Sequence, residues 1–137
     1  MIVYNGGTYD LFHVGHVQFL ERASHYGDVV VALNTDEFVE QFKGRRPVMT
    51  FAERYGLLSG CKYVSRVIPN ISGADSKPTI VSVRPNFIVS GSDWENKDYF
   101  KQMQFTQKWL DEQGIALIYV PYTTNISSTI IKERLGL

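Results

Sequence analysis

The amino-terminal segment of the chain places a glycine-rich turn between a predicted strand and a predicted helix. Residues 1–4 are apolar, and their β-branched and aromatic side chains fit a buried strand. After the glycines at 6–7, apolar side chains recur at helical spacing, at Val17, Leu20 and Ala23. In a parallel α/β sheet such a turn lies at the carboxyl ends of the strands, where ligands bind. The helix start directs free backbone N–H groups into that crevice, which favours phosphate.

The remainder of the chain alternates strand and helix patterns. Apolar runs predict further strands at residues 29–33, 63–68, 87–89 and 115–120. Capping and breaker residues predict further helices at residues 37–42, 50–60, 98–112 and 127–135, with a short one beginning near residue 78. This alternation predicts an α/β fold, a Rossmann-like doubly wound parallel sheet of about five strands with right-handed crossovers. A length of 137 residues fits a single domain spanning residues 1–137.

Composition argues against several classes of partner. Fourteen basic and fourteen acidic residues cancel, so no long-range field favours nucleic acid or an anionic membrane. No run approaches the roughly 20 apolar residues that span a bilayer, and residues 1–4 lack the basic flank of a secretory signal. Cys61 is the one cysteine, which excludes an intrachain disulfide and a cysteine-built zinc site. We therefore expect a cytoplasmic protein with no nucleic-acid partner and no membrane insertion.

Two histidines stand at the start of the first predicted helix. His13 and His16 are three residues apart, so they share one face of the first helical turn. Each imidazole can donate a hydrogen bond to a phosphoryl oxygen, and Gly15 between them lets a bulky group approach the backbone. A histidine here could instead cap the helix or fill a gap under the loop. Two at this spacing, after a strand and a Gly-Gly turn, favour the phosphate-binding interpretation.

Residues 7–16 read Gly-Thr-Tyr-Asp-Leu-Phe-His-Val-Gly-His, which resembles the nucleotide-binding motif of the small nucleotidyltransferases. The segment is most similar to that of the cytidylyltransferases, and among them to the glycerol-3-phosphate cytidylyltransferase group. The resemblance implies that His13 and His16, the histidines of a His-x-Gly-His motif, are catalytic. It also implies nucleotide contacts from the turn and from the glycine between the histidines, that is, from Gly7, Thr8, Tyr9, Asp10 and Gly15.

A second run of hydroxyl side chains precedes the last predicted helix. Ser127, Ser128 and Thr129 combine side-chain donors with the free N–H groups of a helix start, which suits phosphate. One of them alone would be an ordinary N-cap. With Ile126 they resemble the family's Ile-Ser-Thr-Thr motif, although Ser128 stands where the family has threonine. The resemblance implies that Ser128 and Thr129 are catalytic. It implies nucleotide binding by Thr123, Ile126 and Ser127.

One position just before this run departs from the family. The glycerol-phosphate enzymes carry an arginine where this chain has Tyr122. A phenol cannot replace the bidentate, permanently charged contact of a guanidinium with phosphate. This departure bears on the identity of the acceptor more than on the type of reaction. Candidates for the missing charge are Arg45, Arg46 and Arg134.

Three further segments carry expected site residues through the resemblance. Lys43 lies in a basic loop whose lysine reaches the triphosphate in the family, although such a loop could simply be solvated. Arg54 matches a family arginine of the active site, although an arginine on a helix is usually solvated. Residues 91–97 resemble the family's Gly-Asp-Asp-Trp-x-x-Lys segment, in which Trp94 would form a wall for the acceptor or else pack under the loop. Asp93 would accept hydrogen bonds from the acceptor's hydroxyls. The expected acceptor-binding residues are Asp10, Arg54, Asp93 and Trp94.

The resemblance implies transfer of a cytidylyl group from CTP to a small phosphorylated acceptor, with release of pyrophosphate. The acceptor would be glycerol 3-phosphate or a similar polyol, sugar or amino-alcohol phosphate. Mg²⁺ would accompany the triphosphate, without a dedicated metal site in the protein. By resemblance alone we also expect a homodimer that makes precursors of cell-surface polymers. Two alternatives stay open: an adenylyltransferase that uses ATP, and a non-catalytic nucleotide-binding protein of the same fold.

Overall fold

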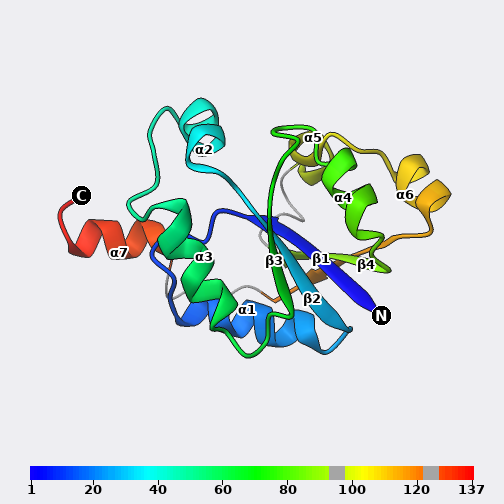
Figure 1. The fold of residues 1–137 in the computed structure, drawn as a ribbon, viewed down its shortest axis with the longest axis horizontal. Helices are drawn as coiled ribbons and strands as arrows, with labels where there is room; N and C mark the ends of the chain where they lie inside the picture. Colours follow the sequence, from blue (N-terminus) through cyan, green and yellow to red (C-terminus); the bar gives the residue numbers. More distant parts are fainter. Residues whose placement is uncertain (93–97, 122–126) are drawn as a thin grey trace.

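Within residues 1–92, 98–121 and 127–137, which the computed structural model describes, five parallel strands form one sheet (Figure 1). The strand order is β3-β2-β1-β4-β5. The strands are β1 (Ile2–Gly7), β2 (Asp28–Leu33), β3 (Arg66–Pro69), β4 (Phe87–Gly91) and β5 (Ala116–Val120). Because β2 lies on one side of β1 and β4 on the other, the chain winds outward from the centre in both directions. The Rossmann-like doubly wound sheet predicted from the sequence is confirmed.

Helices cover both faces of this sheet. One face is covered by α1 (Val14–Ser24) and α3 (Phe51–Ser59). The opposite face is covered by α4 (Lys77–Val83), α5 (Tyr99–Met103) and α6 (Gln107–Gln113). The two remaining helices of the described residues are α2 (Asp36–Lys43), which follows β2, and α7 (Ser128–Arg134). None of the helices in the described ranges is long and apolar enough to cross a bilayer.

Each face of the sheet has its own apolar core, and β2 contributes to both. Val29, Val31 and Leu33 pack in the core under α1 and α3. Val30 and Ala32 pack in the core under α4, α5 and α6. Successive side chains of a strand point to opposite faces, so a strand buried on both sides must be apolar throughout. The unbroken apolar run of β2 therefore has a direct structural cause.

The segment predicted as one helix over residues 98–112 is in fact two helices, and that prediction is wrong. Gln104 ends α5 in the left-handed region, with a φ of 58°. Phe105 then turns into the core, where its side chain is 4% exposed. Thr106 begins α6 as its N-cap, its Oγ1 accepting from the Trp109 N–H at 3.1 Å. Burial of Phe105 and capping by Thr106 prevail over the helical spacing of the apolar residues.

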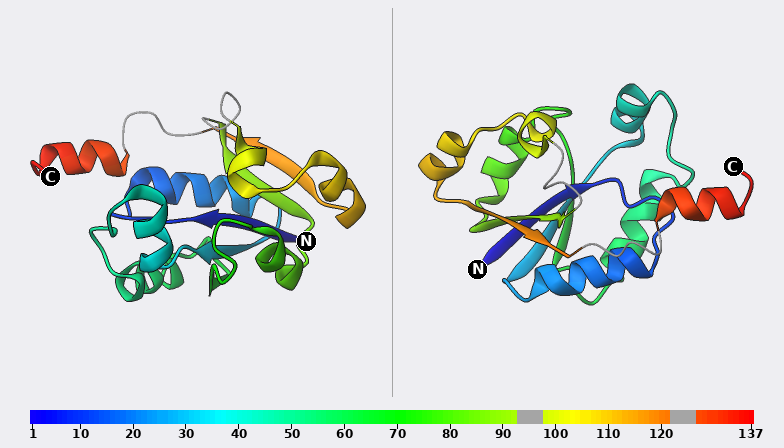
Figure 2. Two further views of the ribbon diagram at one scale, coloured as in Figure 1. Left: turned by 90° about the horizontal axis from the view of Figure 1, so that it is seen from above. Right: turned by 180° about the vertical axis from the view of Figure 1, so that it is seen from behind.

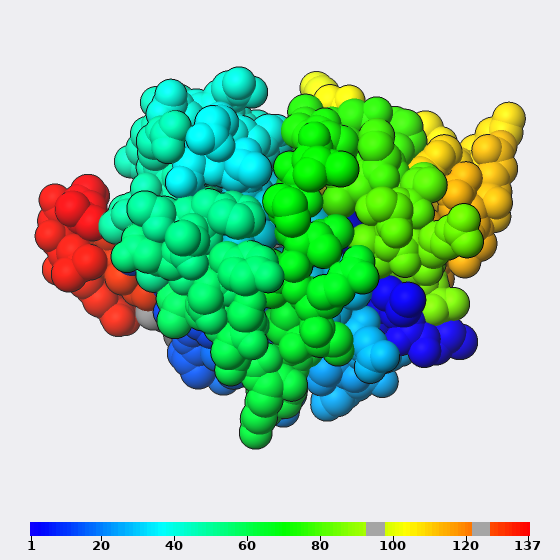
Figure 3. Space-filling model, in the orientation of Figure 1, coloured from blue at the N-terminus to red at the C-terminus, as the bar shows by residue number. Residues whose placement is uncertain are grey.

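Helix α7 projects from the body of the molecule (Figures 2 and 3). None of its residues is buried. Its first turn nevertheless lies against the turn that follows β1, because the Ser128 hydroxyl donates to the Asp10 carbonyl oxygen at 2.5 Å. This contact brings together two segments 118 residues apart in the chain.

Candidate active site

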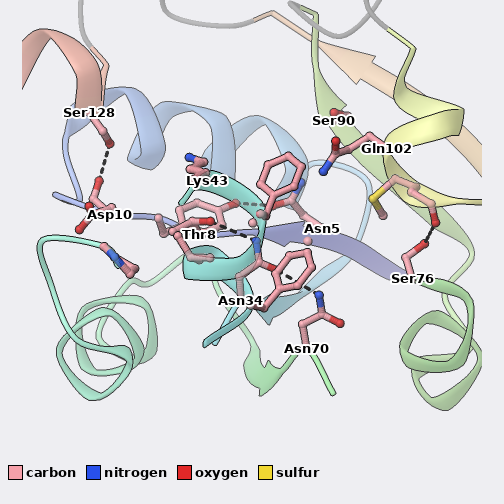
Figure 4. A pocket seen from close by; sticks show the side chains of 18 of the residues that line it. Asn5, Thr8, Asp10, Asn34, Lys43, Asn70, Ser76, Ser90, Gln102 and Ser128 are labelled. Atoms are coloured by element: carbon pink, nitrogen blue, oxygen red, sulfur yellow. Dashed lines mark hydrogen bonds between the residues drawn. The ribbon is translucent and has the colours of Figure 1, made fainter. Parts of the chain in front are cut away.

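A cavity of about 440 Å³ opens at the carboxyl end of the sheet. Its walls come from the turn after β1, the residues that follow β2 and β3, the end of β4 and the first turn of α7. Figure 4 shows Asp10 and Ser128 on one side of this cavity, and Ser76, Ser90 and Gln102 on the other. Of the residues expected at the site from the histidine and hydroxyl turns, His16, Ser128 and Thr129 line this one cavity. His13, Gly15 and Ser127 do not line it.

The two histidines form a capping box at the start of α1. His13 is the N-cap, and its Nδ1 accepts from the Gly15 N–H at 3.0 Å. The His16 Nδ1 accepts in return from the His13 N–H at 3.1 Å, and the two rings stack with centroids 3.9 Å apart. Helix capping and ligand binding are therefore not exclusive, because capping uses only Nδ1. An imidazole that accepts at Nδ1 carries its proton on Nε2 when neutral, so both rings are Nε2–H donors.

The surroundings keep both imidazoles neutral. Burial lowers the pKa of His13. Burial and the neighbouring His13 lower the pKa of His16 to about 3, although the Asp10 carboxylate acts in the opposite direction. The Nε2 atom of His13 is enclosed and has no hydrogen-bond partner among the described residues. An enclosed donor without a partner is rare in a folded protein, and a catalytic role is one explanation for it.

The turn between β1 and α1 is locked by Tyr9. Its backbone is in the left-handed region, with a φ of 54°, and its buried hydroxyl donates to Asn5 Oδ1 at 2.5 Å. A Cβ on Gly7 would lie 2.9 Å from the Tyr9 ring, so only glycine fits there. The Asn5 amide in turn donates to the Val89 carbonyl at 2.8 Å, which ties the turn to β4. Tyr9 therefore stabilises the turn from its buried side.

Asp10 joins the same turn to two other segments. Its Oδ1 accepts from the Met49 N–H at 2.9 Å and its Oδ2 accepts from the Val48 N–H at 2.8 Å. Lys132 Nζ lies 3.5 Å from Oδ2. Both carboxylate oxygens are thus occupied within the protein, and Asp10 is 6% exposed. In this structure Asp10 positions the loops of the site and does not offer the free carboxylate expected for the acceptor.

The second turn supplies one cap and two cavity-lining hydroxyl residues. Ser127 Oγ accepts from the Ile130 N–H at 3.1 Å and is the N-cap of α7. The ordinary capping interpretation therefore accounts for Ser127. Ser128 and Thr129 both line the cavity. The expected residues Thr123 and Ile126 of this turn, and Asp93 and Trp94 of the acceptor wall, lie outside the described residues.

Four basic side chains give the cavity a surplus of positive charge. They are Lys43, Arg45, Arg46 and Lys132. Burial and repulsion from Lys132 lower the pKa of Lys43, with the Asp10 carboxylate opposing and Arg45 adding to the repulsion. Asp10 is the one carboxylate among the described lining residues. Such a surplus favours the binding of an anion with several charges.

The candidates for the missing arginine charge differ in their surroundings. Arg46 is already paired with acids of α2, its Nε lying 3.0 Å from Glu40 and its Nη2 3.5 Å from Glu37. Arg134 is exposed and does not line the cavity. Arg45 lines the cavity, and no ion pair involves it within the described ranges. Arg45 is therefore the cation that remains available.

Arg54 is not where an acceptor can reach it, and the expectation of direct acceptor contact is wrong. Its side chain is 0% exposed and every guanidinium nitrogen donates within the protein. Nη1 bonds the carbonyls of Thr8 at 2.8 Å and Asn34 at 2.9 Å, and Nε bonds that of Met49 at 3.1 Å. Nη2 bonds Asp36 Oδ1 at 2.7 Å. Burial tends to raise the pKa of Asp36, but the bonds from Arg54 and the Phe51 N–H hold it below its usual value.

Some lining residues lie outside the sequence-based expectations. Lys132 is one, although it follows Ser128 by four residues and so shares its face of α7. Asn34 and Asn70 are two more. Each directly follows a strand, β2 or β3, and so stands at the carboxyl edge where ligands bind. Their position directly after a predicted strand is the sequence feature that could have identified them as site residues.

Comparison with known proteins agrees with this geometry. A family model described as cytidylyltransferase-like matches residues 4–134. A glycerol-3-phosphate cytidylyltransferase of Bacillus subtilis is 37% identical over 131 residues, covering 95% of this chain and 93% of that protein. An ethanolamine-phosphate cytidylyltransferase of Arabidopsis thaliana is 36% identical over 134 residues, covering 96% of this chain and 32% of that protein.

A solved structure described as the lipopolysaccharide core biosynthesis protein from Thermoplasma volcanium has a similar fold. It superposes with a TM-score of 0.71 at 25% identity, over 90% of this chain and 98% of that one. The family model spans nearly the whole chain, and His16 of the paired histidines lines one cavity with Ser128 and Thr129 of the hydroxyl turn. The chain belongs to the cytidylyltransferase-like family and is a nucleotidyltransferase.

Proposed function

We propose that this protein transfers the cytidylyl group of CTP to a small phosphate-monoester acceptor, releasing pyrophosphate and forming a CDP-linked product. One observation carries the proposal. The neutral imidazole of His16, the first turn of α7 and the cations Lys43 and Arg45, which pair with no acid among the described residues, line one cavity, and the His13 ring stacks on His16. Phosphate-rich substrates need this combination of donors and charge.

The chemistry is an in-line displacement at the α-phosphorus of CTP. A phosphate oxygen of the acceptor attacks, a new P–O bond forms, and the bond to the pyrophosphate oxygen breaks. A phosphate monoester is already a dianion for the most part at neutral pH, so no strong general base is needed. His13 and His16 then act as Nε2–H donors to the oxygens on which negative charge develops.

The β- and γ-phosphates are the groups that the basic cluster would hold. Lys43, Lys132 and the Thr129 hydroxyl are donors that line this end, whereas the Ser128 hydroxyl donates its proton to the Asp10 carbonyl. Mg²⁺ would come bound to the triphosphate, where it neutralises charge on the leaving pyrophosphate. Within the described residues no group of three or more His, Cys, Asp or Glu side chains could hold a metal.

The names of the relatives indicate the chemical class of the acceptor and not one particular compound. Relatives are named for glycerol 3-phosphate and for ethanolamine phosphate, so we propose a polyol, sugar or amino-alcohol phosphate. A homodimer in the cytoplasm is also proposed. Its support is the exposed apolar end of the chain, where Leu135 and Leu137 are 63% and 66% exposed.

Pyrophosphate release tests the proposal directly. The protein is incubated with Mg²⁺ and either CTP or ATP, with and without each of a panel of phosphorylated polyols, sugars and amino alcohols. We expect acceptor-dependent release with CTP. A preference for ATP would indicate an adenylyltransferase. Tight CTP binding by calorimetry without turnover on any acceptor would contradict the proposed reaction and favour a non-catalytic nucleotide-binding protein.

A further inference from the structure

The cavity has a second end that is polar but carries no free charge among the described residues. Asn34 lies there, held between two partners. Its Nδ2 donates to Thr8 Oγ1 at 3.0 Å, and its Oδ1 accepts from Asn70 Nδ2 at 3.0 Å. Asn70 is itself saturated, since it also donates to the Gly73 carbonyl at 3.2 Å and accepts from Thr79 at 3.3 Å. Figure 4 shows this amide chain running from Thr8 into the cavity floor.

The orientation of the Asn34 amide is therefore fixed, while half of its hydrogen-bonding capacity is unused. A side-chain amide has two N–H donors and two acceptor lone pairs. Asn34 uses one of each within the network. The remaining donor and acceptor suit a hydroxyl group, which both accepts and donates. Ser76 and Gln102 add further neutral polar groups to the lining of this end.

An aromatic wall stands beside these amides. Phe38 and Phe42 of α2 both line the cavity, and their rings stack with centroids 6.0 Å apart and planes 10° apart. Phe38 Cδ1 lies 3.9 Å from where a Cβ on Gly73 would be, next to the Asn70 loop. Phe42 is 54% exposed. An aromatic side chain so exposed at a cavity rim contributes little to the core, and its flat face is available to a ligand.

The same helix places a cation next to the aromatic wall. Lys43 directly follows Phe42, and Arg45 lines the cavity two residues later. The one carboxylate among the described lining residues, that of Asp10, is occupied by backbone N–H groups and Lys132. A phosphate would find positive charge here, but an ammonium group would find no free counter-charge in the described lining. This combination favours an uncharged skeleton that bears a phosphate.

The strand order indicates which substrate uses this end. The histidines follow β1 and the hydroxyl turn follows β5, so the donors proposed for the nucleotide's phosphates come from the β1–β4–β5 half of the sheet, except Lys43 at the end of α2. Asn34, Asn70 and Phe38 follow β2 and β3 in the other half. The amide and aromatic wall is thus left for the acceptor.

We propose, on the basis of the cytidylyl transfer argued above, that the acceptor is the phosphate of a cyclic sugar. The apolar C–H face of the ring packs on Phe42 and Phe38, ring hydroxyls bond Asn34 and Gln102, and the phosphate points to Arg45. A flat aromatic face beside fixed planar amides matches a ring that is apolar on its faces and hydroxylated at its edge. Glycerol has no such face, and ethanolamine carries an ammonium group.

The first experiment ranks acceptors by kcat/KM for pyrophosphate release with Mg·CTP. The probes are glucose 1-phosphate and ribose 5-phosphate as cyclic sugars, with glycerol 3-phosphate and phosphoethanolamine as the open-chain neutral and cationic alternatives. We expect at least one sugar phosphate to exceed both alternatives by about tenfold, the size of one well-made aromatic or hydrogen-bond contact. A higher kcat/KM for glycerol 3-phosphate or phosphoethanolamine overturns the inference and leaves cytidylyl transfer intact.

The second experiment measures equilibrium binding of the same four probes by calorimetry, in the presence of a CTP analogue with a methylene bridge between the α- and β-phosphorus. It separates the two proposals when no probe is turned over. Preferential binding of a sugar phosphate without turnover supports the acceptor inference and contradicts the reaction. Binding of no sugar phosphate, or weaker binding than glycerol 3-phosphate, overturns the inference.

Variants of the aromatic wall give a matched test. Phe42→Leu keeps apolar area but removes the flat face, and is expected to raise KM for the sugar phosphate about fivefold to tenfold. Phe42→Tyr should retain the KM. Tyr55→Ala is the control, because Tyr55 is 41% exposed in a similar pair with Phe51, 6.0 Å between centroids, outside the cavity. Equal sugar-phosphate KM values in Phe42→Leu and the unaltered protein would overturn the role of the wall.

Discussion

Each imidazole of the His-x-Gly-His motif has two functions because it has two nitrogens. Nδ1 accepts a backbone N–H and so replaces the serine and glutamate of an ordinary capping box. Nε2 is thereby left as a donor, and of the two rings that of His16 lines the cavity. Serine or threonine at the N-cap would cap the helix equally well, but would place no donor at the position of Nε2. The need for both functions explains why the helix begins with histidines.

Replacement of His16 should therefore affect turnover more than nucleotide binding. His16→Ala is expected to lower kcat by about 10²–10³, the usual loss for one transition-state donor. CTP affinity by calorimetry should change far less. His25→Ala is the matched control, since His25 is exposed at the other end of α1. A His16→Ala protein with nearly normal kcat would contradict the assignment.

The lowered pKa of His16 also predicts how stability depends on pH. In the unfolded chain His16 takes up a proton near its ordinary pKa of 6.5, whereas in the folded protein it does so only near pH 3. The stabilisation is fully present above pH 6.5 and is lost as the pH falls toward 3. The loss for this group is at most about 1.4 kcal/mol per pH unit.

Urea unfolding at pH 7 and pH 5 measures this effect. The free energy of unfolding should be lower at pH 5 than at pH 7. His16→Asn, which cannot titrate but can still accept the His13 N–H, should reduce the fall. An equal fall in both proteins would show that other groups are responsible.

Arg54 connects several elements at the edge of the site. It lies in α3 and bonds the carbonyl oxygens after β1 and β2 and the carboxylate that begins α2. A guanidinium has five N–H donors in a rigid plane, and this geometry suits several acceptors at once. The turn of the motif is thus held from behind by a helix that contributes nothing directly to the proposed chemistry.

Arg54→Lys should destabilise the protein by about 3–5 kcal/mol, the usual effect of breaking a buried ion pair. An ammonium cannot reach the four acceptors, and Asp36 loses its partner. Thermal unfolding measures the loss. Arg46→Lys is the control, because Arg46 pairs with the same Asp36 at 3.8 Å but is exposed, and exposed pairs contribute about 0–1 kcal/mol. Equal shifts in the two variants would contradict the proposed role.

The sequence predicted the elements well where local rules decide them. The Thr50 and Glu53 capping box begins α3 as expected, and the apolar runs of β1, β2 and β4 are strands. The α5–α6 break was missed because helical spacing of apolar residues continues through Phe105, while tertiary burial decides its direction. Arg54 was misjudged for the same reason, since its burial depends on carbonyls from segments far away in the chain.

At the scale of the whole molecule, formal neutrality conceals a local excess of charge. The chain has a formal net charge of zero, yet four of its cations line the cavity beside a single occupied carboxylate among the described residues. Glu37 and Glu40 pair with one of them, Arg46, and Asp10 pairs with Lys132, so Lys43 and Arg45 are left without an acid among the described residues. Composition could not reveal this arrangement, because it depends on where the fold brings segments together.

Lys132→Gln is expected to weaken CTP binding by about 1.5–3 kcal/mol, the range for a hydrogen bond to a charged group. This corresponds to roughly tenfold or more in Kd, with a smaller dependence on ionic strength than in the unaltered protein. Arg134→Gln, on the same helix but outside the cavity, is the control. Calorimetry at low and high salt compares them. Unchanged affinity in Lys132→Gln would remove Lys132 from the site.

The bond between the Ser128 hydroxyl and the Asp10 carbonyl fastens a helix with no buried residue to the turn after β1. Neither apolar core includes a residue of α7. Loss of this attachment would therefore remove Thr129 and Lys132 from the cavity while both cores stay intact, so the protein can lose its phosphate-binding wall without unfolding.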